Sequence, residues 1–275
     1  GVIHRFMSIE KQAEEVKKVK AEKLLCAAAI GVKDYQERAE ALVKFGVDIL
    51  VIDLAHGHSK YAGKTLDYLK EKYPHVDIMV GNIATKDAAE YFLSKKADAI
   101  KVGIGAGSLC TTRLMTGAGI PQITAIMDAY EASQGKIPIC ADQAIRTPGD
   151  IVKALGAGAN TVMCGFLLAG TDETPGEIIV NEEDWRKFKL YRGSASYDVS
   201  LMNKGTERDI ISIEGTETLI PYKGPISPII REVLGGLASG MTYIGAMTME
   251  NLIGKADFIE ITSAGLRESE PHGKK

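Results

Sequence analysis

Short apolar runs alternate with longer amphipathic segments from the start of the chain to about Gly176. The apolar runs show little alternation of apolar and polar positions, which is typical of parallel strands covered on both faces by helices. They predict strands at Gly1–His4, Lys23–Ile30, Asp48–Asp53, Asp77–Gly81, Ala99–Val102, Ile137–Ala141 and Asn160–Cys164.

The segments between these strands have the apolar spacing of amphipathic helices. One helix is predicted over Asp34–Phe45, another begins after Thr85, and a third begins at Thr147–Pro148, an N-cap followed by proline at the first helical position. Repeated strand–helix units of this length fit either a (β/α)8 barrel or a doubly wound sheet.

Residues at the strand ends favour the barrel. Asp53, Asn82, Asp142, Gly165 and a loop around Cys110 each stand at or just after the end of a strand. A barrel distributes its site over many strand ends, whereas a doubly wound nucleotide-binding fold concentrates glycines after its first strand. We therefore expect a TIM (β/α)8 barrel that lacks its first strand–helix unit, because that unit precedes residue 1 or because the chain is a fragment.

The rhythm breaks after about Gly176. A long polar excursion from Trp185 to Lys223 is followed by a helical segment over Ser227–Leu234. A long irregular stretch in a compact domain is usually a flap over the site. We therefore predict one catalytic barrel domain over residues 1–275, with an active-site flap at about 185–223.

Composition narrows the function classes. The 275 residues are 45% hydrophobic and 25% charged with a net charge of −3, which favours neither nucleic acid nor a membrane surface as partner. No apolar run is long enough to span a bilayer, and the first residues do not resemble a signal peptide. The four cysteines have no metal-ligand spacing, and free thiols suggest a reducing, cytoplasmic setting.

One cysteine differs from the other three. Cys26, Cys140 and Cys164 lie in apolar runs, whereas Cys110 lies in the loop Gly103–Arg113, among Gly, Ser and Thr residues. Backbone amides and a nearby arginine are the setting that lowers a thiol pKa, and the thiolate is the nucleophilic form. Cys110 is therefore the candidate nucleophile.

Several motifs in order give the chain its resemblance to a known family. They are Val102–Arg113, Asp53–Ser59, Gly81–Thr85, Tyr191–Gly193, Pro221–Gly224 and Gly265–Ser269. On these motifs the chain resembles the IMP dehydrogenase/GMP reductase family over nearly its whole length. The resemblance implies a (β/α)8 barrel, usually a homotetramer. Many members carry a paired regulatory module inserted at the position of Val19–Lys23. Here the chain continues through this segment without that module.

The resemblance also implies covalent chemistry at purine carbon 2. The Cys110 thiolate would add to that carbon, and hydride would pass between it and NAD or NADP through a shared thioimidate. Thr112 and Glu214 match groups that move the proton of water or ammonia. The substrate-binding positions it implies are Ser108, Asp142, Gln143, Ala144, Gly165, Phe166, Tyr191, Gly193 and Ser194.

The cofactor and a cation complete the implied site. Asp53 and Asn82, with Gly103 and Gly105, match the residues that bind nicotinamide and its ribose. A potassium ion would lie on carbonyls of the cysteine loop and on two residues of a neighbouring subunit. The cation set is Gly105, Gly107, Cys110, Glu268 and Ser269.

Departures from the family pattern bear on which reaction to expect. Dehydrogenases carry an Arg-Tyr pair on the flap, but here the nearest candidate is Arg208 without a tyrosine. The short flap, Gly193–Ser196 and Glu214 resemble the reductase version, which favours GMP reductase. The segments Asp53–His58 and Gly265–His272 resemble dehydrogenases, so IMP dehydrogenase is the alternative.

The phosphate cradle departs as well. The family usually has Asp-Gly-Gly where this chain has Asp142–Ala144, and a small residue where it has Phe166. Amides that approach a phosphate tolerate side chains poorly, although Gln143 offers its own amide. A 5′-monophosphate, an unphosphorylated purine and a non-catalytic homologue that binds a purine ligand all stay open at this point.

Overall fold

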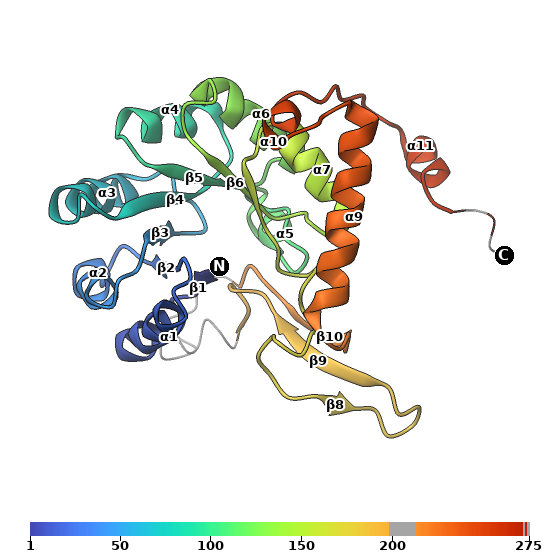
Figure 1. The fold of residues 1–275 in the computed structure, drawn as a ribbon, viewed down its shortest axis with the longest axis horizontal. Coiled ribbons are helices and arrows are strands. Elements are labelled where there is room, and N and C mark those ends of the chain that lie inside the picture. The colour runs from blue at the N-terminus through green and yellow to red at the C-terminus, as the bar shows by residue number, and fades with distance from the viewer. Residues whose placement is uncertain (198–212, 272, 274–275) are drawn as a thin grey trace.

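The computed structural model describes residues 1–197, 213–271 and 273. Within this part of the chain, seven parallel strands form one sheet in sequence order: β1 (Val2–Ile3), β2 (Ala27–Ile30), β3 (Ile49–Asp53), β4 (Asp77–Ile83), β5 (Ala99–Val102), β6 (Ile139–Asp142) and β7 (Thr161–Met163). The sheet curls, and helices cover its outer face (Figure 1). This is the architecture of a (β/α)8 barrel with seven of its strands described, and the predicted fold class is confirmed.

Helices alternate with these strands. They are α1 (Ile9–Ala21), α2 (Tyr35–Lys44), α3 (Lys60–Lys72), α4 (Lys86–Ser94), α5 (Thr112–Thr116), α6 (Gln122–Ser133) and α7 (Pro148–Gly156). Both predicted N-caps are confirmed: the Thr85 hydroxyl accepts from the Ala88 N–H at 3.3 Å, and Thr147 forms a capping box with Asp150. These caps fix where the chain turns from strand end to helix.

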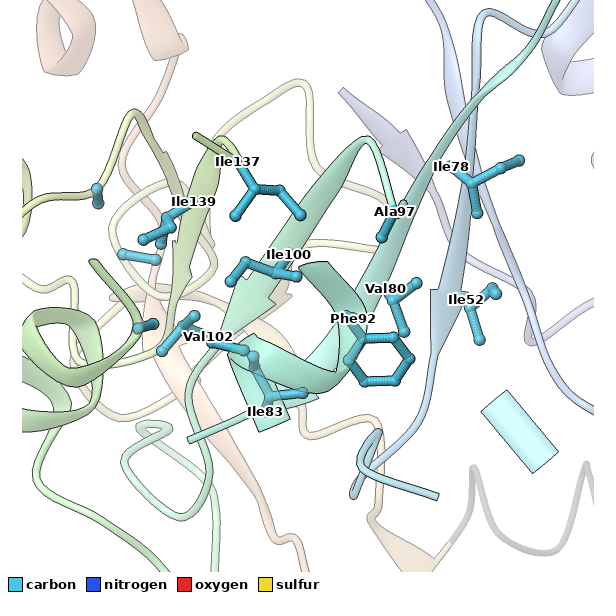
Figure 2. Packing of buried hydrophobic residues seen from close by; sticks show 14 of the residues in the cluster. Ile52, Ile78, Val80, Ile83, Phe92, Ala97, Ile100, Val102, Ile137 and Ile139 are labelled. Carbon is cyan, nitrogen blue, oxygen red and sulfur yellow. The ribbon is translucent and has the colours of Figure 1, made fainter. Parts of the chain in front are cut away.

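The core lies between the sheet and the helices. Ile78 and Val80 of β4, Ile100 and Val102 of β5 and Phe92 of α4 are fully buried together (Figure 2). Because successive side chains of a strand point to opposite faces, the residues between these positions point into the barrel. The strand period therefore sends Lys101 to the interior of the barrel.

Carboxylates secure the amino-terminal ends of the strands. The Asp48 carboxylate accepts from the Cys26 N–H at 2.7 Å and pairs with the Lys20 ammonium at 2.8 Å. Asp98 repeats this arrangement with the Ile78 N–H at 2.7 Å and Lys70 at 2.8 Å. These contacts stabilise the amino-terminal end of the barrel. In barrels of this kind the ligand site lies at the opposite, carboxyl end.

Two strand predictions need correction at their starts. The strand predicted over Lys23–Ile30 begins at Ala27, because the chain after α1 first folds back, with the Leu24 N–H donating to the Val19 carbonyl. The strand predicted from Ile137 begins at Ile139, directly after Pro138. Both corrections leave the carboxyl ends of the strands in place.

The part predicted as an irregular flap contains two strands of a second sheet, whose third strand precedes it. Strands β8 (Ile179–Val180), β9 (Lys187–Arg192) and β10 (Glu217–Pro221) pair antiparallel in the order β10-β9-β8. Residues 193–216 connect the two longer strands along the chain. The position singled out for the dehydrogenase pair, Arg208, lies outside the described residues.

The helix predicted over Ser227–Leu234 is α9 (Ile226–Ile244), and it runs ten residues further. Two of its glycines let it pack closely against α7, and the helix continues through them. A Cβ on Gly236 would lie 2.3 Å from Pro148 Cβ, and one on Gly240 would lie 2.6 Å from Val152. The short helices α10 (Met249–Leu252) and α11 (Ser263–Glu268) follow, and α11 stands away from the barrel (Figure 1).

Candidate active site

A cavity of about 1050 Å³ opens at the carboxyl ends of the parallel strands. Its size exceeds the roughly 300–1,000 Å³ of most small-molecule sites, so it has room for more than one ligand group. Most predicted site residues line it: Asp53, Asn82, Gly105, Gly107, Ser108, Cys110, Thr112, Asp142, Gln143, Ala144, Gly165, Phe166, Tyr191, Gly193, Ser194 and Glu214. Residues far apart in sequence thus converge on one cavity.

The loop after β5 presents the candidate nucleophile. Cys110 is partly exposed to the cavity, and its N–H donates to the Gly107 carbonyl at 3.1 Å, which closes a tight turn. Its Sγ lies 3.1 Å from Thr112 Oγ1, at the first residue of α5. A thiol and a hydroxyl in direct contact can exchange a proton or share one with a bound ligand.

The segment that leads into β10 docks on this loop. The Thr111 N–H donates to the Glu214 carbonyl at 2.9 Å, and the Thr216 N–H donates to the Leu109 carbonyl at 3.0 Å. These bonds hold Glu214 beside the Cys110–Thr112 turn, although the two segments are separated by the whole second half of the barrel. The three residues expected to be catalytic therefore lie on adjacent backbone segments.

A buried lysine joins the next group of predicted residues. Lys101 Nζ lies 3.0 Å from Asp53 Oδ1 and 2.7 Å from Asp142 Oδ2, and it also donates to Asn82 Oδ1. Burial alone would lower the pKa of this ammonium, but the Asp142 and Asp53 carboxylates together raise it above its ordinary value. The lysine is therefore charged at neutral pH and holds both carboxylates.

Sequence reasoning missed Lys101. The available signal was a lysine between Ile100 and Val102 in an otherwise apolar strand. A charge in a buried strand is unfavourable unless oppositely charged groups lie beside it. Its partners lie on β3, β4 and β6, so only the curled sheet reveals the cluster.

Gly103 permits the close approach of neighbouring strand ends. Asn82 Nδ2 donates to the Gly103 carbonyl at 2.8 Å and to Asp142 Oδ2 at 3.0 Å. A Cβ on Gly103 would lie 1.8 Å from the Asp142 carbonyl oxygen, and its φ of +147° is rare for residues with side chains. Gly103 thus supports the site through its backbone and is not among the cavity-lining residues.

The segment expected to be the phosphate cradle, Asp142–Ala144, has an unusual backbone. Gln143 and Ala144 have φ values of +116° and +59°, which glycine adopts far more readily. The Ala106 N–H donates to Gln143 Oε1 at 2.6 Å, so this side chain bridges to the cysteine loop. The ring centroids of Phe166 and Tyr191 are 6.0 Å apart, and burial, followed by the nearby Asp142 carboxylate, raises the pKa of Tyr191.

Two predicted cation residues lie elsewhere in this chain. Glu268 and Ser269 belong to and follow α11 and do not line the cavity, and the Ser269 hydroxyl donates to the Gly265 carbonyl at 2.9 Å. Within the described ranges no group of three or more His, Cys, Asp or Glu residues could hold a metal ion. None of the helices described in the structure is long and apolar enough to cross a membrane.

The comparison with known families agrees with this geometry. A family model described as "IMP dehydrogenase / GMP reductase domain" matches residues 1–272. The chain belongs to the IMP dehydrogenase/GMP reductase family. The resemblance expected from the sequence motifs is thereby confirmed.

The relatives include both named activities. An inosine-5′-monophosphate dehydrogenase from Nitrosopumilus maritimus is 44% identical over 259 residues, covering 90% of this chain and 54% of the relative. One from Rhodopirellula baltica is 46% identical, covering 91% and 48%. A crystal structure of GMP reductase from Trypanosoma brucei in complex with guanosine 5′-monophosphate matches with a TM-score of 0.85 and 45% identity, covering 91% of this chain and 52% of that one. The chain spans about half the length of these relatives.

Proposed function

We propose that this chain is an NAD(P)-dependent oxidoreductase that acts at carbon 2 of a purine nucleotide, in the direction of GMP reductase. The observation that carries the proposal is the Cys110–Thr112–Glu214 arrangement. Cys110 Sγ lies 3.1 Å from Thr112 Oγ1. The N–H of Thr111, the residue between these two, donates a hydrogen bond to the Glu214 carbonyl. A nucleophile with a proton-transfer group beside it is what addition to carbon 2 and loss of ammonia require.

The purine nucleotide would lie along the cysteine loop and the ends of β6 and β7. Asp142 would accept hydrogen bonds from the ribose hydroxyls. Tyr191, from the expected flap base, would reach the far end of the nucleotide. The remaining substrate contacts would come from Ser108, Gln143, Ala144, Gly165, Phe166, Gly193 and Ser194, all of which line the cavity. This placement puts carbon 2 within reach of Cys110.

The nicotinamide cofactor fits the other side of the cavity. Asp53 ends β3, Asn82 belongs to β4 and Gly105 follows β5, and all three line the cavity. The Asp53 side chain is 30% exposed although it contacts Lys101. An open carboxylate of this kind suits the ribose hydroxyls of a dinucleotide. When bound, the reduced nicotinamide supplies the hydride for carbon 2.

The protein's part in the reaction is nucleophilic attack and proton transfer. The Cys110 thiolate forms a bond to carbon 2 of GMP, and the carbon–nitrogen bond to the 2-amino group breaks. Thr112, working with Glu214, delivers the proton that lets the amino group leave as ammonia. After carbon 2 receives hydride, its bond to sulfur breaks and Cys110 returns as the thiolate, leaving IMP.

The runner-up is IMP dehydrogenase, in which water resolves the same thioimidate to XMP. It is favoured by relatives named inosine-5′-monophosphate dehydrogenase at 44–46% identity. The family resemblance also supports a potassium ion on the carbonyls of Gly105, Gly107 and Cys110, a homotetramer and a cytoplasmic location. Because Glu268 and Ser269 lie away from the cavity, they would reach that ion only from a neighbouring copy.

Turnover assays decide the direction. We expect the protein to convert GMP and NADPH to IMP and ammonia, with no XMP from IMP and NAD. Cys110→Ala abolishes turnover, and Glu214→Gln slows ammonia release about a hundredfold or more, while Cys26→Ala, which changes a buried strand cysteine, leaves it intact. Formation of XMP and NADH would instead assign the chain to IMP dehydrogenase.

A further inference from the structure

We infer that Lys189 and Lys223 are positioning residues, which pin the loop after β7 (residues 164–174) to the strand pair β9–β10. This lysine clamp holds Phe166 and Tyr191 together as one wall of the proposed substrate site. The inference rests on the proposed function and deepens it, because neither lysine lines the cavity and each acts through residues that do.

Lys189 is a buried lysine that the proposed chemistry does not use. It lies within β9 and is 5% exposed. Its Nζ donates to the Thr171 carbonyl at 2.9 Å and to the Thr174 carbonyl at 2.7 Å, and among the described residues it forms no ion pair with a carboxylate. A buried charge is tolerated only where hydrogen bonds compensate for its lost hydration. Lys189 therefore ties β9 firmly to the loop after β7.

The bonds of Lys189 set the position of Tyr191. Side chains two residues apart on a strand extend from the same face, so Lys189 and Tyr191 share one face of β9. The Tyr191 hydroxyl lies 3.1 Å from where a Cβ on Gly165 would be, at the start of the loop that Lys189 holds. Fixing Lys189 to this loop thus fixes how closely Tyr191 approaches Gly165.

Lys223 holds the same loop nearer its start. It belongs to the motif Pro221–Gly224, to which the proposed reaction assigns no role. Its Nζ donates to the Phe166 and Leu167 carbonyls at 3.2 and 3.1 Å and lies 5.4 Å from the centroid of the Phe166 ring. Its backbone N–H donates to the Gly170 carbonyl at 2.9 Å. One side chain therefore holds Phe166 by both its carbonyl and its ring.

The two held residues meet at the cavity. The ring centroids of Phe166 and Tyr191 are 6.0 Å apart, and both side chains line the cavity. The Asp172 N–H donates to the Gly224 carbonyl at 2.9 Å, so a backbone bond also joins the loop to the segment after β10. Loss of one lysine should therefore loosen the wall and leave the two segments joined.

The decisive variant is Lys223→Met, assayed with GMP and NADPH. We expect the KM for GMP to rise about fivefold or more, with kcat and the KM for NADPH changed less than about twofold, because the wall contacts the nucleotide and not the reacting groups. Lys223→Arg keeps the charge and the donors and should restore most of the GMP affinity.

The matched control is Lys187→Met, the same change in β9. The Lys187 ammonium lies 6.0 Å from the centroid of the Tyr222 ring, so it packs on the strand pair itself. This variant should leave all three constants unchanged. An unchanged KM for GMP in Lys223→Met, or an equal loss in all three constants, would overturn the inference.

Hydrogen exchange provides a second readout that does not depend on turnover. In Lys223→Met and in Lys189→Met we expect the amides of residues 165–171 to exchange about tenfold faster or more, while those of β3 keep their rates. If the unaltered protein turns over neither GMP nor IMP, the proposed function fails, and exchange then decides the clamp alone. Unchanged protection of residues 165–171 in both variants would overturn it.

Discussion

Replacing Lys101 with methionine should be the most destructive change of a single charged side chain at the site. The Lys101 side chain is 6% exposed, and its ammonium lies 3.0 Å from Asp53 and 2.7 Å from Asp142, while Arg5 lies 3.8 Å from the other Asp53 oxygen. Methionine fills a similar volume without charge, so both carboxylates would be left facing each other across a partly dry interior.

The size of the loss follows from burial. Removing one partner of a buried ion pair costs about 3–5 kcal/mol, and exposed pairs contribute about 0–1 kcal/mol. Because Asp53 and Asp142 are 30% and 24% exposed, solvent screens part of their repulsion. We expect a loss of roughly 2–3 kcal/mol, or a fall in Tm of roughly 5–10 °C for a chain of this size.

Thermal and urea unfolding measure this loss, and the chain supplies a matched control. Lys70→Met makes the same substitution at a 2.8 Å pair with Asp98 in which both side chains are about 30% exposed, and it should cost under about 1 kcal/mol. Because the folded pKa of Lys101 is raised, its stabilisation is complete below the unfolded pKa of about 10.4 and is lost as pH rises through the folded pKa. The deficit of Lys101→Met should thus be constant from pH 7 to about pH 10 and shrink only as pH rises above the unfolded pKa of about 10.4. Equal losses for the two variants would refute the reasoning.

Three further changes test the backbone and the strand ends. Ala144→Gly, at a φ of +59°, should stabilise the chain by about 0.5–1 kcal/mol in urea unfolding, and a loss would contradict the strain. Gly103→Ala would place a Cβ 1.8 Å from the Asp142 carbonyl oxygen and should cost about 3 kcal/mol or more, so near-normal stability would show that the strand ends can separate. The Lys20 hydrogen bond holds the pKa of Asp48 below its ordinary value, so its stabilisation exists above the unfolded pKa and is lost as pH falls through the folded one. Asp48→Asn should therefore lower the urea midpoint at pH 7 and much less at pH 3; equal losses at both would argue against the pair.

Much of the barrel could be predicted because its strands and helices have distinct local patterns. The strand Ala99–Val102 and the caps Thr85 and Thr147 appear where expected, since apolar runs and capping residues act over a few positions. The cysteine loop could also be located, because glycine, serine and threonine around Cys110 differ sharply from the apolar runs that hold the other cysteines.

Contacts between distant segments could not be predicted in this way. Lys189 belongs to a strand that looked like part of a polar excursion, yet it is buried, with Nζ donating to the Thr171 and Thr174 carbonyls at 2.9 and 2.7 Å. The same holds for Lys101 and for the bond between Gln143 and Ala106. In each case the partner lies on another strand or loop, and the sequence shows only a polar residue in an unexpected place.

The most direct test of the central claim is covalent trapping at Cys110. A purine 5′-monophosphate with a halogen at carbon 2 would be incubated with the protein, and intact-mass and peptide analysis would locate any adduct. We predict one adduct per chain, with the sulfur of Cys110 bonded to carbon 2 and the halide released, and none in Cys110→Ala. An adduct on another cysteine would contradict the assignment of Cys110 as the nucleophile. The absence of any adduct in a reaction without competing GMP would contradict it as well.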